Sequence, residues 1–149
     1  MAVCYALKVE GNDEVIMLGG PDDDSIIDEV KVQIDTIDDN TRNKSKGTLA
    51  RVFIKGQCNL EETEKNSKLN EELTKIFNWS IDFSSNTYRS VTVDVYNDEK
   101  KFRVYKLDKM FVRDYQEHYK GTGDDSSETC WFELDLTQQD NHWELVSAN

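Results

Sequence analysis

The chain has 149 residues, a length that suits one domain with a single hydrophobic core. Hydrophobic residues make up 37% and charged residues 32%, and 18 basic against 30 acidic residues give a formal net charge of −12. This charge argues against nucleic acid and against an anionic membrane surface as partners, because both attract clustered Lys and Arg. We also expect neither a membrane-spanning helix, which needs roughly 18 apolar residues in a row, nor a secretory signal.

Alternation of apolar and polar residues predicts strands in the N-terminal half of the chain. The expected strands are 3–9, 15–18, 30–36 and 48–58. The first two are separated by Gly11-Asn12-Asp13, which is typical of a hairpin turn. The segment 19–25 (GGPDDDS) is predicted to be a loop by its composition, and 38–47 (DDNTRNKSKG) is predicted to be a loop because it contains no apolar residue.

One segment has the periodicity of a helix. Four apolar residues fall at positions i, i+4, i+7 and i+8, namely Leu69, Leu73, Ile76 and Phe77. They form one apolar stripe on a helix of 3.6 residues per turn. The spacing predicts an α-helix at about 67–78.

Strands are predicted again in the C-terminal half. The expected strands are 91–96, 101–119, 130–137 and 142–146. The second of them is long enough to require a bend, which we place near 107–109, and 120–128 is predicted to be a loop. The sequence therefore predicts a mainly β protein, an antiparallel β-barrel or two-sheet sandwich of about eight strands with one flanking α-helix, in a single domain spanning 1–149.

The segment 111–119, FVRDYQEHY, does not fit an ordinary one-sided strand. Strict alternation places Phe111, Arg113, Tyr115, Glu117 and Tyr119 on one face and Val112, Asp114, Gln116 and His118 on the other. The first face mixes aromatic rings with charges, a composition found in the buried centres of protein interfaces. Two interpretations remain open: another subunit covers these aromatic residues, or they cover the helix or the rim of the barrel themselves.

Residues that carry chemistry are scarce. The two histidines, His118 and His142, lie in no metal-binding spacing, and the chain contains no CxxC motif. The three cysteines, Cys4, Cys58 and Cys130, are odd in number and widely spaced, which favours reduced thiols in the cytoplasm. We therefore predict no catalytic residues, no metal site and no cofactor, and expect the protein not to be an enzyme.

The segment 76–139 carries an ordered set of packing motifs. A helix ending in IFNWSID precedes a strand containing Tyr88, Arg89, Val91, Val93 and Val95, and the next long strand contains Phe111, Val112, Asp114, Tyr115 and Glu117. A strand of alternating apolar residues, ETCWFELDLTQQ, follows. Over roughly 47–139 this order resembles the tube-forming proteins of contractile injection systems, the haemolysin-coregulated protein of type VI secretion and phage tail tube proteins. One position departs from the family pattern: Arg113 stands where a small apolar residue is expected.

The resemblance implies a compact β-barrel with one helix. Six copies would form a ring, and the rings would stack into a hollow tube with sheath, spike and baseplate proteins as partners and effector cargo as a further option. Stacking copies that carry a net charge of −12 each requires local charge complementarity. The candidates for the assembly interface are Lys44, Lys46, Arg51, Arg113, Tyr115 and Tyr119. The subunit would be made in the cytoplasm, and export within the injected tube is an option.

A second function class is compatible with the same residues. A monomeric β-sandwich binding module would use exposed aromatic side chains to recognise protein or carbohydrate. It differs from the tube subunit in oligomeric state, since it predicts a monomer with an aromatic platform in place of a ring interface.

Overall fold

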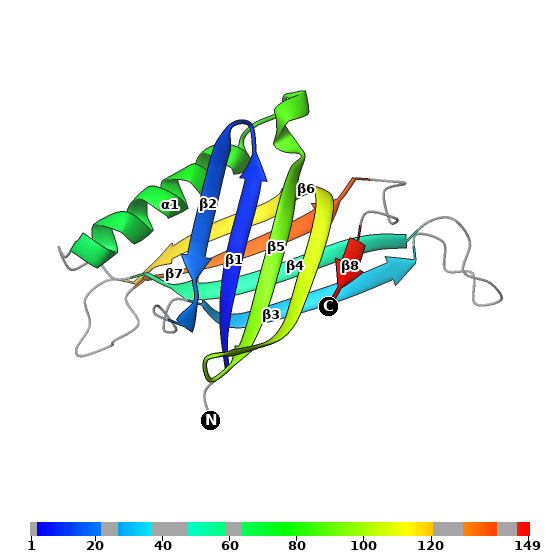
Figure 1. Ribbon diagram of the computed structural model, residues 1–149. Coiled ribbons are helices and arrows are strands. Elements are labelled where there is room, and N and C mark those ends of the chain that lie inside the picture. Colours follow the sequence, from blue (N-terminus) through cyan, green and yellow to red (C-terminus); the bar gives the residue numbers. More distant parts are fainter. Residues whose placement is uncertain (1–2, 22–26, 37–47, 59–63, 121–129, 140–145) are drawn as a thin grey trace.

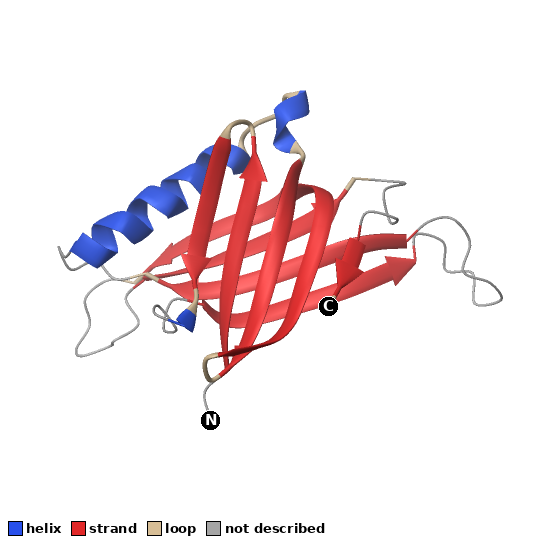
Figure 2. Ribbon diagram, in the orientation of Figure 1, coloured by secondary structure: helices blue, strands red, loops and turns tan. Residues whose placement is uncertain are grey.

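The computed structural model describes residues 3–21, 27–36, 48–58, 64–120, 130–139 and 146–149. Within these ranges the strands are β1 (Val3–Gly11), β2 (Glu14–Gly19), β3 (Ile27–Thr36), β4 (Thr48–Gln57), β5 (Arg89–Asn97), β6 (Lys100–Tyr119), β7 (Cys130–Gln138) and β8 (Val146–Ala148). The helices are α1 (Glu64–Ser80) and the short 3-10 helix η2 (Ser85–Thr87). The expected class, mainly β with one α-helix, is confirmed (Figure 2).

All eight strands belong to one antiparallel sheet, in the order β2-β1-β5-β6-β7-β4-β3, with β8 paired to β6. Figure 1 shows that the sheet folds over on itself: β2, β1, β5 and the start of β6 form one layer, and the end of β6 with β7, β4 and β3 forms the other. In the described part of the chain the ladder does not close into a complete barrel, and β2 and β3 are its two edges. The helix α1 lies beside β2 (Figure 1).

The 20-residue strand β6 is the corner that joins the two layers. Its first half pairs with β5 and its second half with β7, and Met110 is opposite both Arg89 and Gln138. Just before this switch Lys109 has a φ of 58°, in the left-handed region that breaks extended backbone. The bend expected near 107–109 is thus confirmed.

The core lies between the two layers and under α1. Its apolar side chains come from every strand of the ladder and from one stripe of the helix, and the largest are Trp79, Phe132, Leu7, Ile16, Ile54, Ile76, Leu107, Met110, Leu134 and Leu136. From Cys130 to Leu136 the buried residues of β7 alternate with half-buried ones, as the period of a strand requires. The predicted alternation is therefore confirmed over 130–136, whereas Thr137 and Gln138 are both buried.

The packing motif around Arg89 joins three elements. Its guanidinium lies 5.3 Å from the centre of the Trp79 ring, and its Nη1 is 3.5 Å from Glu14 on β2. Trp79 in turn donates from Nε1 to the carbonyl of Thr87, at 2.6 Å. Arg89 is only 4% exposed. Its contacts with the Trp79 ring and the Glu14 carboxylate connect the end of α1, the first hairpin and β5.

Several element boundaries differ from expectation. The helix begins three residues earlier and ends two residues later than the apolar stripe predicts, at Glu64 and Ser80. The strand β3 begins at Ile27, which is buried, with a register irregularity that the alternating pattern from 30 onward does not show. The last strand is Val146–Ala148 in place of 142–146, and residues 142–145 lie outside the described ranges.

The prediction of reduced thiols is wrong for two of the three cysteines. Cys58 and Cys130 form a disulfide with a Cα–Cα distance of 5.3 Å, and the Cys58 amide donates to the Cys130 carbonyl at 3.2 Å. Cys4 is buried and takes no part in a disulfide. Sequence spacing could not reveal the pair, because the two residues are 72 positions apart and meet only when β4 and β7 become neighbours.

No helix in the described ranges combines the length and the apolar character that crossing a membrane requires.

Candidate functional site

The second half of β6 contains a β-bulge at Arg113. Val112 is opposite Leu136 and Asp114 is opposite Asp135, so Arg113 is an extra residue without a counterpart on β7. The bulge reverses the faces of the strand from that point on. The prediction of one uninterrupted alternation through 111–119 is therefore wrong, and Phe111 and Tyr115 lie on opposite sides of the sheet.

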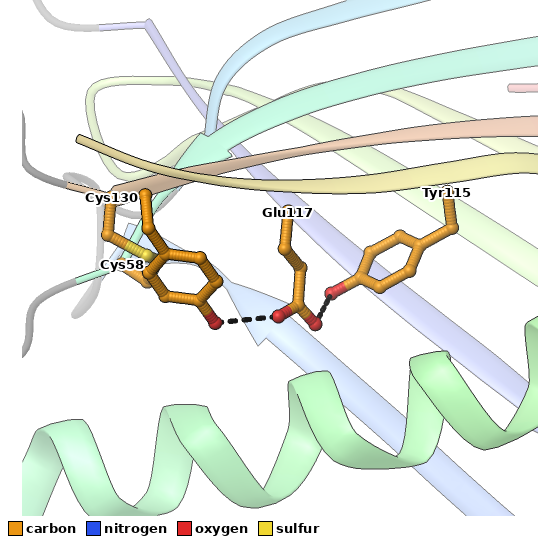
Figure 3. The surroundings of a disulfide bond; sticks show 5 residues. Cys58, Tyr115, Glu117 and Cys130 are labelled. Carbon is orange, nitrogen blue, oxygen red and sulfur yellow. Dashed lines mark hydrogen bonds between the residues drawn. A yellow bond between two sulfur atoms is a disulfide. The ribbon is translucent and has the colours of Figure 1, made fainter.

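Beyond the bulge, Tyr115, Glu117 and Tyr119 lie on the core side. Tyr115 is opposite Leu134 and packs against the core cluster. Both tyrosine hydroxyls donate to the Glu117 carboxylate, Tyr115 at 2.8 Å and Tyr119 at 2.7 Å. Figure 3 shows Tyr115 and Glu117 projecting from β6 toward α1, with Glu117 between Tyr115 and the disulfide. One carboxylate thus orients two aromatic rings.

The pKa values of both tyrosines reflect this arrangement. Burial raises the pKa of the Tyr115 hydroxyl far above its usual range, and the hydrogen bond to Glu117 adds to the effect. For Tyr119 the hydrogen bond to Glu117 is the main cause of a raised pKa, because this side chain is 64% exposed. The neutral hydroxyl is favoured in both cases, since it is the form that can donate to the carboxylate.

The side of β3, β4, β7 and the second half of β6 that faces away from the core forms a polar surface, which we call the outer face. Its members, by strand, are Lys31 and Gln33 on β3, Arg51, Phe53 and Lys55 on β4, Trp131, Glu133 and Asp135 on β7, and Asp114, Gln116 and His118 on β6. The β4 row is basic and the β7 row beside it is acidic. Adjacent strands therefore present opposite charges, and cross-strand pairs of this kind stabilise a sheet. The same rows of charge can be matched by complementary charges on a partner.

Asp135 is the centre of the outer face. Arg113 Nη1 lies 3.8 Å from its Oδ2, and Arg51 approaches it from β4. Burial raises the pKa of the Asp135 carboxyl; Arg51 opposes this shift, and the nearby Asp114 carboxylate adds to it. Two of the predicted interface residues, Arg51 and Arg113, thus meet around one half-buried acid.

A hollow of about 220 Å³ adjoins this cluster. Its lining residues are Lys31, Gln33, Arg51, Phe53 and Asp135. The Lys31 ammonium lies over the Phe53 ring, 5.9 Å from its centre.

An imidazole–indole stack lies on the outer face, near the end of β6. The rings of His118 and Trp131 are 4.7 Å apart and nearly parallel, and His118 Nε2 is 3.0 Å from Glu133 Oε2. The alternation of β7 already assigned Trp131 and Glu133 to the face opposite the core. The stack was missed because the bulge moves His118 onto that face as well.

The six predicted interface residues do not form one site. Arg51 is on the outer face and the bulged Arg113 reaches Asp135 of that face, whereas Tyr115 and Tyr119 are on the core side of β6. Lys44 and Lys46 lie outside the described residues. In the described ranges no group of three or more His, Cys, Asp or Glu side chains is arranged to hold a metal ion.

The raised pKa of Asp135 predicts a pH dependence of stability. A folded-state pKa above the unfolded value of 3.8 means that this acid stabilises the fold fully below pH 3.8, and the contribution is lost as pH rises through the folded pKa. We expect the difference in unfolding free energy between wild type and Asp135→Asn to grow in favour of wild type as pH falls from neutral toward 4. Urea unfolding at a series of pH values measures it, and a difference that does not change with pH would contradict the assignment.

No protein-family model matches the chain, and no curated protein matches its sequence. Solved structures do match its fold. The structure of Hcp1 from Flavobacterium johnsoniae aligns with a TM-score of 0.51 at 12% identity, over 97% of this chain and 94% of that one. Hcp1 from Salmonella typhimurium aligns with a TM-score of 0.51 at 6% identity, over 89% of this chain and 81% of that one.

A chain of the PVC sheath–tube complex in the extended state, from an extracellular contractile injection system, aligns with a TM-score of 0.52 at 16% identity. This match covers 98% of this chain and 88% of that one. The likeness includes the N-terminal strands, beyond the 47–139 range in which sequence motifs had indicated it. The resemblance to tube-forming proteins is confirmed at the level of the fold, which this chain shares with Hcp proteins and with that component of a contractile injection system.

Proposed function

We propose that the chain is a non-enzymatic structural subunit of a tube. In this proposal six copies form a ring, and rings stack into the inner tube of a phage tail-like or type VI-like contractile injection apparatus. The observation that carries it is a fold likeness spanning 97% of this chain and 94% of Hcp1 from Flavobacterium johnsoniae. The whole chain, 1–149, would act as one tail-tube-like domain, because the match leaves no large segment for a second one.

The geometry of the sheet supports assembly from copies of one chain. No strand in the described ranges pairs with the outer edge of β3, which offers ten residues of backbone to a neighbour. The outer face adds rows of opposite charge, basic on β4 and acidic on β7. A ring of subunits uses heterologous contacts, in which one surface meets a different surface of the next copy. Rows of opposite charge allow such contacts despite a net charge of −12 per chain.

The proposed partners follow from this role. The tube would be enclosed by a sheath, begin at a baseplate and carry a spike, and its lumen could hold effector cargo. The subunit would be made in the cytoplasm and could leave the cell within the injected tube. One solved neighbour is named as part of a sheath–tube complex, which supports a sheath as the first partner to test.

The alternative, a monomeric binding module, is favoured by one observation. Phe83 is 96% exposed and Phe102 66% exposed, and exposed aromatic rings can recognise protein or carbohydrate. Native mass spectrometry of the purified full chain, followed by negative-stain microscopy, separates the two functions. Rings or tubes are expected; a strict monomer at high protein concentration would overturn the tube proposal and leave the binding module.

Charge reversal at the bulge tests whether the outer face takes part in assembly. We expect Arg113→Glu to weaken ring formation about fivefold, the size of roughly 1 kcal/mol per charged contact. Lys106→Glu is the matched control, since Lys106 is exposed on the first half of the same strand. The ring population is read from native mass spectra at equal protein concentration. Equal losses in the two variants would mean that net charge, and not the outer face, controls assembly.

A further inference from the structure

The two edges of the sheet are not equivalent. The edge strand β2 has the helix α1 beside it (Figure 1). Two side chains of α1 bond to outward backbone groups of β2. The Met17 amide donates to Glu72 Oε2 at 3.0 Å, and Lys75 Nζ donates to the Val15 carbonyl at 3.3 Å. An edge strand normally leaves such groups open to water or to another strand.

Glu72 and Lys75 act as a matched pair. They lie at positions i and i+3 of the helix, and Lys75 Nζ is 3.1 Å from Glu72 Oε1. Each carboxylate oxygen of Glu72 therefore has its own partner, the Met17 amide or the Lys75 ammonium. Their side chains are 18% and 35% exposed, so the pair is partly shielded from water. Partial shielding strengthens charge-assisted hydrogen bonds of this kind.

The chemistry of the pair is that of a neighbouring strand. A strand docked beside β2 would present a carbonyl to the Met17 amide and an amide to the Val15 carbonyl, on either side of Ile16. Glu72 supplies the acceptor and Lys75 the donor at those two positions. The Glu72 and Lys75 side chains could leave these positions by a change of rotamer. A strand of the same chain at this edge would have to unfold to do so.

We propose that Glu72 and Lys75 guard the β2 edge against strand pairing with a second copy of this chain. The pair occupies the hydrogen-bonding positions that a strand of the second copy would need. While Glu72 and Lys75 hold their hydrogen bonds to β2, edge-to-edge association has to use the outer edge of β3. An open edge is a liability in any soluble β protein, so the guard does not depend on the tube proposal.

The test is the double variant Glu72→Ala/Lys75→Ala. It removes one charge of each sign and leaves two good helix formers, so the net charge and the helix are preserved. Lys68→Ala/Glu71→Ala is the matched control, because this exposed pair also lies at i and i+3 on the same helix. Sedimentation velocity at equal concentration should show larger species for the first variant than for wild type, and no change for the control. Amide exchange at Met17 should accelerate about tenfold, as expected for the loss of one hydrogen bond.

Two further variants assign any added association to this edge. Adding Met17→Pro to the double variant removes the outward donor of β2, so the added association should disappear. Glu72→Gln/Lys75→Arg keeps one acceptor and one donor, so it should sediment as wild type. That result would show that the hydrogen bonds, and not the negative charge of Glu72, block strand pairing. The proposal is overturned if the double alanine variant sediments as wild type, or if its added association survives Met17→Pro. Failure of the wild type to form rings would leave both comparisons intact, which separates this test from that of the tube proposal.

Discussion

Removing the disulfide is expected to lower the free energy of unfolding by about 4 kcal/mol, the value that chain entropy gives for a loop of this size. Cys58 and Cys130 are 72 positions apart, so the bond holds a long loop closed in the unfolded chain. It also joins the end of β4 to the start of β7, next to the last residue of β6. Urea unfolding of oxidised protein, compared with protein in excess dithiothreitol, measures the effect without any substitution.

The variant Cys58→Ser/Cys130→Ser is the control. Its stability should match that of the reduced wild type, apart from the cost of a hydroxyl at position 130, which is 1% exposed. Dithiothreitol should not change this variant further. If the reductant destabilises the double variant as much as the wild type, the effect does not come from this bond.

Tyr115→Ala is expected to lower the free energy of unfolding by about 3 kcal/mol, at the low end for a large aromatic residue in a core. Tyr115 packs against the core cluster, and its hydroxyl is bonded to Glu117. The same substitution at Tyr119, which is 64% exposed and bonds to the other oxygen of Glu117, should cost about 1 kcal/mol or less. The two tyrosines are matched in chemistry and differ mainly in burial.

The pair of variants also decides between the two interpretations of FVRDYQEHY. If Tyr115 is part of the core, Tyr115→Ala lowers the thermal midpoint at any protein concentration. If another subunit covers it, the variant keeps its midpoint as a dilute monomer and loses assembly instead. Thermal unfolding at low and high concentration measures both quantities, and a midpoint unchanged in the dilute sample would contradict the placement of Tyr115 in the core.

The sequence predicts well those features that repeat over several residues. The helix is visible because Leu69, Leu73 and Ile76 recur on one face, and all three are buried. The β7 faces are visible because Phe132, Leu134 and Leu136 alternate with polar residues. The first turn of α1 was missed because it has no apolar residue to continue the stripe, although Glu64 suits the positive end of the helix dipole.

Features that depend on one residue, or on two distant ones, could not be predicted. A single extra residue at Arg113 leaves no trace in a period of two, yet it reverses every later side chain of β6. The only signal was that Arg113 departs from the small apolar residue of the family pattern. The disulfide and the edge contacts of Glu72 and Lys75 require the fold to bring together residues far apart in the chain. The assembly interface stays a prediction; the fold places Arg51 and Arg113 near each other and the two tyrosines on the opposite side of β6.

The close fit between Gly11 and Arg89 has a consequence for how related chains can vary. A Cβ added at Gly11 would lie 2.7 Å from Cγ of Arg89, a separation that real Cβ atoms do not tolerate. Arg89 cannot easily move aside, because it is held between Trp79 and Glu14. Substitution at position 11 therefore becomes acceptable only after position 89 has become smaller, so divergence at these two sites should be correlated and ordered in evolutionary time.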